Sequence, residues 1–123
     1  GARETVPEQF TDRRFLVHNP QVTLMRTTVD ENQQMAQWIA AKVNRSTAPI
    51  EILIPEHGLS MLDVEGAAFY DPTADQCLFE TLEQEVQQTD ERRITRFPCH
   101  INDAAFAEAL VAAFERVSGS RFN

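Results

Sequence analysis

The fold is decided by a stretch late in the sequence, RRITRFPCHINDAAF, which runs from Arg92 to Phe106. Its first six residues, RRITRF, are typical of a β-strand. A helix pattern follows the PCH segment, with Asn102 or Asp103 as its expected N-cap. That helix is expected to turn five apolar side chains inward: Phe106, Ala109, Leu110, Ala113 and Val117. A strand that passes directly into a helix is typical of α/β proteins.

Two further pairs of strand and helix precede this stretch. RFLV, residues 14–17, predicts a strand that ends at His18, and the following QVTLM, residues 21–25, either extends the sheet or folds over its edge. A T-x-x-E capping box at Thr28 then starts a helix. The apolar side chains that this helix is expected to pack against the sheet are Met35, Trp38, Ile39 and Val43.

The middle of the chain repeats the pattern. IEILI, residues 50–54, predicts a strand that Pro55 ends, and the long connection that follows is expected to be a functional loop. Asp71 is the expected cap of the next helix, with Pro72 at its first position. The inward stripe of this helix is expected to be Leu78, Leu82 and Val86.

This alternation of strands and helices predicts the fold class. Right-handed crossover helices return each strand to the same direction, so the strands are expected to form a mainly parallel sheet between two layers of helices. We therefore expect residues 1–123 to form a single α/β domain, a three-layer sandwich of the Rossmann or flavodoxin-like kind.

Composition and charge limit the classes of partner. With 19 acidic against 11 basic residues the net charge is -8 at pH 7, which repels phosphate backbones and anionic lipids. Neither nucleic acid nor a membrane is therefore an expected partner. The two cysteines, Cys77 and Cys99, form no C-x-x-C motif, and no apolar stretch is long enough to span a bilayer. We expect a cytoplasmic protein.

The histidines indicate a candidate site. His18, His57 and His100 each follow one of the predicted strands, and ligands of α/β proteins bind at the carboxyl ends of parallel strands. The ligand-binding candidates at this edge, besides His18 and His57, are Asn19, Arg26, Thr27, Thr28, Gly58, Ser60, Asp63 and Asn102. Arg26 and the helix N-termini supply positive potential, so the sequence predicts a small, polar, anionic ligand.

Several of these candidates also have a purely structural interpretation. Thr28 and Asn102 would cap helices in any protein. Ser60 and Asp63 could do no more than order a surface loop. Arg26 could form an ion pair with a carboxylate that is distant in sequence. The residue types alone leave both interpretations open.

Two other functions are open from the residues alone. His100 and Asp103 are the candidate catalytic residues of a hydrolase or lyase, in which the imidazole acts as general acid or base. Histidines and a carboxylate could also hold a metal, but no H-x-H or H-x-x-x-H spacing occurs, so no metal ligand is assigned. The third function is an oligomerisation or interaction module, because an uncovered edge of a parallel sheet favours a homo-oligomer.

Four segments carry a resemblance to a known family: HNPQVTLMRTT (18–28), GLSMLD (58–63), FYDPTAD (69–75) and HINDAAFAEA (100–109). In this order they resemble the C-terminal part of a family of uncharacterised bacterial and fungal proteins. That family also includes the plant inhibitor of tobamovirus replication, and its members are described as resistance-protein-like ATP-binding proteins.

The resemblance implies a longer protein. Members of the family are two-domain α/β proteins roughly three times as long, in which this chain would be the second half of the C-terminal domain. The resemblance attributes ATP binding to an N-terminal domain, so ATP is expected only in a longer chain, with that domain as a further partner. Where relatives carry P-L-R-G or P-x-K-G after the second strand, this chain has Pro55, Glu56, His57 and Gly58.

Overall fold

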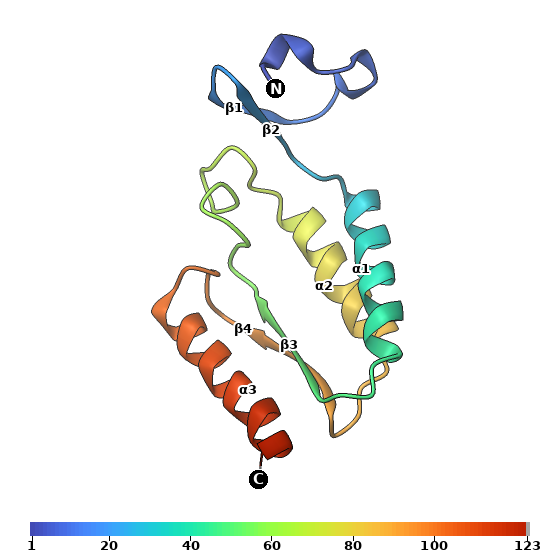
Figure 1. The fold of residues 1–123 in the computed structure, drawn as a ribbon. Helices are drawn as coiled ribbons and strands as arrows, with labels where there is room; N and C mark the ends of the chain where they lie inside the picture. The colour runs from blue at the N-terminus through green and yellow to red at the C-terminus, as the bar shows by residue number, and fades with distance from the viewer. Residues whose placement is uncertain (123) are drawn as a thin grey trace.

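Figure 1 shows the order of the elements in the computed structural model, which describes residues 1–122, with side chains described as far as residue 119. Two short 3-10 helices, Arg3–Thr5 and Glu8–Phe10, begin the chain. The elements that follow are β1 (Phe15–Asn19), β2 (Val22–Met25), α1 (Val29–Asn44), β3 (Ile50–Pro55), α2 (Pro72–Glu85), β4 (Arg92–Phe97) and α3 (Ala104–Phe122). Among the described residues, no helix is both long and apolar enough to cross a membrane.

The first strand does not join the parallel sheet, so the expectation of three strands side by side in one direction is wrong for β1. β1 pairs with β2 in an antiparallel hairpin, with Phe15 opposite Met25. In the turn between them the backbone N–H of Gln21 donates to Oδ1 of Asn19 at 2.9 Å. Strands joined by so short a turn run antiparallel, because a parallel pair needs a crossover of about a dozen residues or more.

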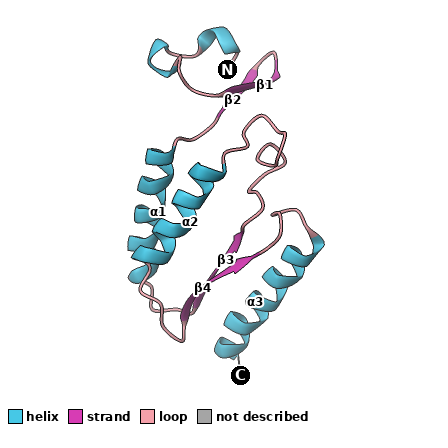
Figure 2. Ribbon diagram, turned by 180° about the vertical axis from the view of Figure 1, so that it is seen from behind, coloured by secondary structure: helices cyan, strands magenta, loops and turns pink. Residues whose placement is uncertain are grey.

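β3 and β4 form a parallel pair, as predicted, with α2 as the crossover between them. Their register runs from Ile50 opposite Arg92 to Pro55 opposite Phe97. α1 and α2 lie on one side of this two-stranded sheet and α3 lies on the other (Figures 1 and 2). The structure is therefore mixed α/β, with a small parallel sheet and three α-helices among the described residues.

Ion pairs join the helices on both sides to the sheet. On one face, Arg96 of β4 pairs with Glu83 of α2 at 2.6 Å. On the other face, Glu51 of β3 pairs with Arg116 of α3 at 2.8 Å. Because neighbouring strand residues alternate between the two faces, these pairs show which side chains of each strand face which helices.

The predicted starts of α1 and α2 are confirmed. Oγ1 of Thr28 accepts from the N–H of Glu31 at 3.2 Å, and the Glu31 carboxylate accepts from the N–H of Thr28 at 3.0 Å, which completes the capping box. Asp71 caps α2 by accepting from the N–H of Ala74 at 3.1 Å, and Pro72 is the first residue of that helix.

The predicted inward face of α1 is wrong. The residues that α1 buries are Asn32, Ala36 and Ala40. This face packs against α2, where Nδ2 of Asn32 donates to the carbonyl of Ala74 at 2.9 Å. Small side chains let the two helices approach closely. Trp38, expected in the core, is 65% exposed, and its large apolar neighbours on the helix, Met35 and Ile39, are exposed with it.

The predicted inward stripes of α2 and α3 are confirmed in part. Leu82 of α2 and Val86, the C-cap of that helix, are buried. Phe106 and Ala113 of α3 are buried as well. The prediction for Leu110 is wrong, because this side chain is 46% exposed. Part of the apolar surface of α3 is therefore left uncovered by the described residues.

Candidate functional site

Two of the three predicted strand ends meet. The N–H of His57, after β3, donates to the carbonyl of Cys99, after β4, and the N–H of Ile101 donates to the carbonyl of Gly58, both at 3.0 Å. Gly58 has a φ of 135°, and a Cβ at this position would lie 2.7 Å from the imidazole ring of His100. The position therefore requires glycine, both for its backbone conformation and for the close approach of the two loops.

The imidazole of His100 is held in place by two backbone partners. Nδ1 accepts from the N–H of Asn102 at 3.1 Å, so Nε2 carries the proton and donates to the carbonyl of Ser60 at 2.8 Å. The carboxylate of Asp103 accepts from the backbone N–H of His100 at 2.8 Å, not from the ring. His100 is buried and both ring nitrogens are occupied, an arrangement typical of a structural histidine.

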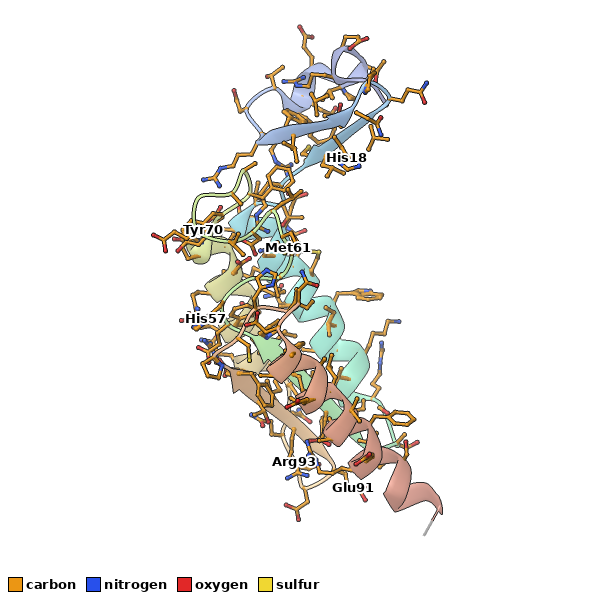
Figure 3. All side chains as sticks on the ribbon, turned by 90° about the vertical axis from the view of Figure 1, so that its left-hand side faces the viewer. His18, His57, Met61, Tyr70, Glu91 and Arg93 are labelled. Carbon is orange, nitrogen blue, oxygen red and sulfur yellow. The ribbon has the colours of Figure 1, made fainter. Side chains whose placement is uncertain are left out.

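The loops after β3 and β4, joined by these bonds, form what we call the junction. His18 and Asn19 lie apart from it. Both are exposed on β1, and the side chain of Asn19 serves the hairpin turn. Figure 3 shows His18 on the hairpin and His57 on a separate part of the molecule. The common rim of three imidazoles expected from the sequence does not form, because β1 is not part of the parallel sheet.

Arg26 joins a buried cluster with two carboxylates that are distant in sequence. Nη2 donates to Oδ1 of Asp75 at 2.7 Å and to Oδ1 of Asp63 at 3.3 Å. Nε donates to the carbonyl of Phe69 at 3.0 Å, and Nη1 donates to Oγ1 of Thr27 at 3.3 Å. The side chains of the arginine and of the two aspartates are only 12%, 5% and 9% exposed. The cluster ties the end of the hairpin to α2 and to the loop after β3.

The two carboxylates of this cluster have different surroundings. Asp63 accepts from the backbone N–H groups of Leu59 at 3.2 Å and Asp71 at 3.4 Å, in addition to the guanidinium. Burial, with a further contribution from the neighbouring carboxyl of Asp63, raises the pKa of Asp75 to about 7, against the opposing effect of Arg26. Asp75 therefore holds its proton to a higher pH than an ordinary aspartate does.

A recess of about 340 Å³ opens beside the cluster at the carboxyl end of β3, and we call it the acidic recess. The residues that give it its character are Glu56, His57, Asp63, Glu65, Tyr70 and Asp75. Gly58 also contributes to its wall. Four carboxyl groups surround this space, so it suits a cationic or hydrogen-bond-donating group better than an anion.

A second recess, of about 210 Å³, lies at the start of α1, and we call it the basic recess. Its lining residues are Asp12, Arg13, Arg14, Arg26, Thr27, Thr28, Val29 and Asp71. Nη2 of Arg13 donates to the carbonyl of Arg26 at 2.7 Å, and Arg13 also pairs with Glu31. Nη1 of Arg14 donates to the carbonyl of Tyr70 at 2.7 Å. Three of the predicted ligand-binding residues, Arg26, Thr27 and Thr28, thus line this recess and not the end of the parallel sheet.

The remaining predicted residues serve the loops. Oγ of Ser60 accepts from the N–H of Leu62 at 3.1 Å, and Asn102 is exposed beside the ring that its N–H contacts. In the part of the chain that the structure describes, no group of three or more histidine, cysteine or acidic side chains is placed to hold a metal ion.

Several residues of the two recesses were not predicted from the sequence, among them Arg13, Arg14 and Asp75. A signal for Asp75 was present, because it falls at helical spacing from the buried Phe79 and Leu82 of α2. An acidic residue in the apolar stripe of a helix is rarely buried without a partner. The two arginines offered no signal beyond their charge.

Together the fold and the recesses define a small α/β domain whose strand-end loops and helix starts line two polar recesses. Residues 1–118 match the family described as the uncharacterised protein family (UPF0261) C-terminal domain. The chain therefore belongs to this family, which confirms the resemblance carried by the four motifs.

Relatives of this chain occur in bacteria and in a plant. The UPF0261 protein RA0729 of Rhizobium meliloti is 54% identical over 117 residues, which are 95% of this chain and 29% of the relative. The UPF0261 protein mlr3387 of Mesorhizobium japonicum is 49% identical over 90% of this chain and 28% of its own length. The ToMV resistance protein Tm-1(GCR237) of Solanum lycopersicum is 42% identical over 96% of this chain and 16% of its own length. The chain spans less than a third of each of them.

Proposed function

We propose that this domain contributes one wall of a small-molecule binding site, and that the basic recess holds an anionic group of the ligand. The observation that carries the proposal is that three guanidinium groups meet the first turn of α1 around this recess. Three arginines against two aspartates give the lining a net charge of one positive unit, in a chain whose net charge is -8.

The hydrogen-bond donors around the basic recess differ in whether they already pair with a carboxylate. Arg13 and Arg26 are already paired with carboxylates. Arg14 bonds to the carbonyl of Tyr70, and no carboxylate in the described part of the chain forms an ion pair with it. The capping box leaves the N–H of Val29 without an intrahelical acceptor, so it and Arg14 are the donors we expect an anion to use.

The size of the basic recess limits what it can hold. Complete sites for small organic ligands usually measure about 300 to 1,000 Å³, whereas this recess has about 210 Å³. It therefore suits one phosphate or carboxylate group, whose oxygens accept well from a guanidinium. The rest of the ligand would lie against another part of a longer family chain.

Thermal unfolding in rising concentrations of inorganic phosphate, with chloride at equal ionic strength as reference, tests this proposal. Phosphate at ten times its Kd stabilises a protein by about 1.4 kcal/mol, so the midpoint of the wild type should rise by about 5 °C. Arg14→Ala should remove most of the rise. Arg93→Ala, which removes an exposed arginine of β4, should retain it. Equal rises in the wild type and R14A would refute the proposal.

A second candidate is acid–base catalysis of the hydrolase or lyase type at the acidic recess. The carboxyl group of Asp75 lines that recess, and burial raises its pKa to about 7, where it can both accept and release a proton. The expected catalyst, His100, has both ring nitrogens bound to the backbone. Asp75 therefore takes the catalytic role in this proposal.

A screen of small esters and phosphate esters near neutral pH tests the second candidate. Asp75→Asn should abolish any turnover that the wild type shows. Glu65→Gln, a change to an exposed carboxylate of the same recess, should retain it. Turnover that survives in D75N would remove Asp75 from the mechanism. A complete absence of turnover in the wild type would count against catalysis by this chain.

Three expectations concern a longer family chain. These are ATP binding by an N-terminal domain, assembly into a homo-oligomer, and completion of a full three-layer sandwich in which this chain is the second half of the C-terminal domain. The third is supported by the position of helices on both faces of a sheet that has only two strands among the described residues.

A further inference from the structure

β3 has a free edge. The N–H of Ile50 donates to the carbonyl of Glu91 at 2.8 Å, so the even-numbered residues of β3 turn their main-chain groups towards β4. In a parallel ladder only every second residue bonds to a given neighbour. The N–H and C=O groups of Glu51 and Leu53 therefore point to the opposite edge, where no strand of residues 1–122 pairs.

α1 carries an apolar flank beside its contact with α2. Successive helix residues are about 100° apart, which puts Ile39 and Met35 beside the buried line of Asn32, Ala36 and Ala40 and puts Trp38 further round the helix. This flank consists of Met35, Trp38 and Ile39, all exposed. The flank on the other side of the buried line is polar, with Gln33 and Gln37. An apolar flank next to a packed face marks surface that belongs to a core.

α3 carries a matching flank in the opposite layer. Its buried line contains Phe106 and Ala113. The adjoining stripe consists of Leu110, Val111 and Phe114 and covers about 100° of the helix circumference. Phe114 is 68% exposed. A helix that is apolar over more than half of its circumference is normally covered on both sides. Within the described residues, α3 packs against the sheet formed by β3 and β4 on one side only.

We propose that the free edge of β3, between the flanks of α1 and α3, is the docking site of a β-strand from another part of the longer family polypeptide. Its main chain would pair with Glu51 and Leu53. Its side chains would be apolar on both faces, because α1 would cover one face and α3 the other. Such a strand would extend the parallel sheet and remove an exposed, largely apolar edge.

The length of the relatives supports the same polypeptide as the occupant. The Rhizobium meliloti relative matches 95% of this chain, yet the matched region makes up only 29% of the relative. A family chain therefore holds ample further sequence for a strand. A segment of the same polypeptide also meets the edge at a high effective concentration, which favours it over a second copy. This inference rests on the proposed completion of the three-layer sandwich and is independent of the proposed basic recess.

Amide hydrogen exchange of this chain and of the full-length Rhizobium meliloti relative tests the proposal. In this chain the N–H groups of Glu51 and Leu53 should exchange fast, while those of Ile52 and Ile54, bonded to β4, should exchange slowly and serve as the internal control. In the relative, the positions aligned with Glu51 and Leu53 should be slowed at least about 100-fold. Fast exchange at both positions of the relative would overturn the proposal.

The fluorescence of Trp38 separates the proposed occupant from a second copy. Trp38 is the single tryptophan of the chain, so its emission reports on the flank of α1. The emission of this chain should be that of an exposed indole and should not change on dilution. The emission of Trp38 could instead shift to the blue, and amide exchange at Glu51 and Leu53 could slow, as the concentration of this chain rises. That result would assign the edge to a second copy and overturn the proposal.

Discussion

The junction after β4 and the ion cluster at the end of β2 are both rich in polar side chains, but they balance their charges differently. At the junction, both ring nitrogens and the backbone N–H of His100 have partners within the chain. In the cluster, the single guanidinium of Arg26 faces the carboxyl groups of Asp63 and Asp75. A high density of polar residues at a strand end therefore does not identify a functional site.

The largest expected effect comes from removing the cation of the cluster. Arg26→Ala leaves two buried carboxylates unpaired and should lower the free energy of unfolding by about 3–5 kcal/mol, as for other broken buried ion pairs. Urea denaturation at a pH of about 8 measures this loss. Arg14→Ala, a change to an exposed arginine, should cost under about 0.5 kcal/mol. A loss below about 1 kcal/mol in R26A would show that water screens the cluster.

The second expected effect concerns the junction. His100→Ala leaves the N–H of Asn102 and the carbonyl of Ser60 without their ring partners and should cost about 2–3 kcal/mol. His100→Gln keeps a donor and an acceptor and should lose less. The same urea experiment measures both variants. A fully stable H100A would mean that the imidazole is not structural and is free for another role.

The third expected effect is the pH dependence caused by Asp75. Its pKa is about 7 in the folded protein against an ordinary value of 3.8, so the folded state binds more protons between these values. The stability that this group contributes is therefore present at low pH and is lost as the pH rises from about 4 to about 7. Asp75→Asn lacks this loss, so its stability relative to the wild type should grow by about 2 kcal/mol across that window, roughly half of what the full pKa shift implies, because solvent screens the site.

Thermal unfolding of the wild type and D75N across that pH range measures the difference between them. Groups other than Asp75 and its neighbour Asp63 affect both proteins alike, so the difference reports on this pair of carboxyl groups. If the wild type gains stability relative to D75N as the pH rises, Asp75 is ionised well below neutrality. In that case the charges of the cluster are balanced within the folded protein, as the hydrogen bonds of the junction are.

Ser60→Ala should have the smallest effect. His100 bonds to the main-chain carbonyl of Ser60, which the substitution retains. The loss is the exposed bond from the N–H of Leu62 to Oγ, worth about 0.5 kcal/mol. A cost in urea denaturation as large as that of H100A would show that the junction depends on the hydroxyl and not on the backbone.

Local signals in the sequence were sufficient for several elements. The capping box from Thr28 to Glu31, and Asp71 followed by Pro72, define helix starts through contacts within four residues, and both predictions are confirmed. The apolar run IEILI, followed later by a crossover helix, was sufficient to predict the parallel pairing of β3 with β4.

Relations between distant segments could not be predicted from the sequence. Periodicity shows which residues of α1 share a face, but not whether the large Trp38 or the small Ala36 meets the neighbouring helix. Arg26 finds its carboxylates 37 and 49 residues further along the chain, and no local spacing encodes that choice. The reversal at Asn19 decided the direction of β2 and removed His18 from the predicted site.

Gly58 makes the conformations of the loops after β3 and β4 depend on each other. A side chain at this position would collide with the ring of His100, and main-chain bonds join the two loops on either side of it. An insertion or deletion in one loop would break these bonds unless the other loop changed with it. A chimaera built from two family members should therefore inherit both loops from a single parent.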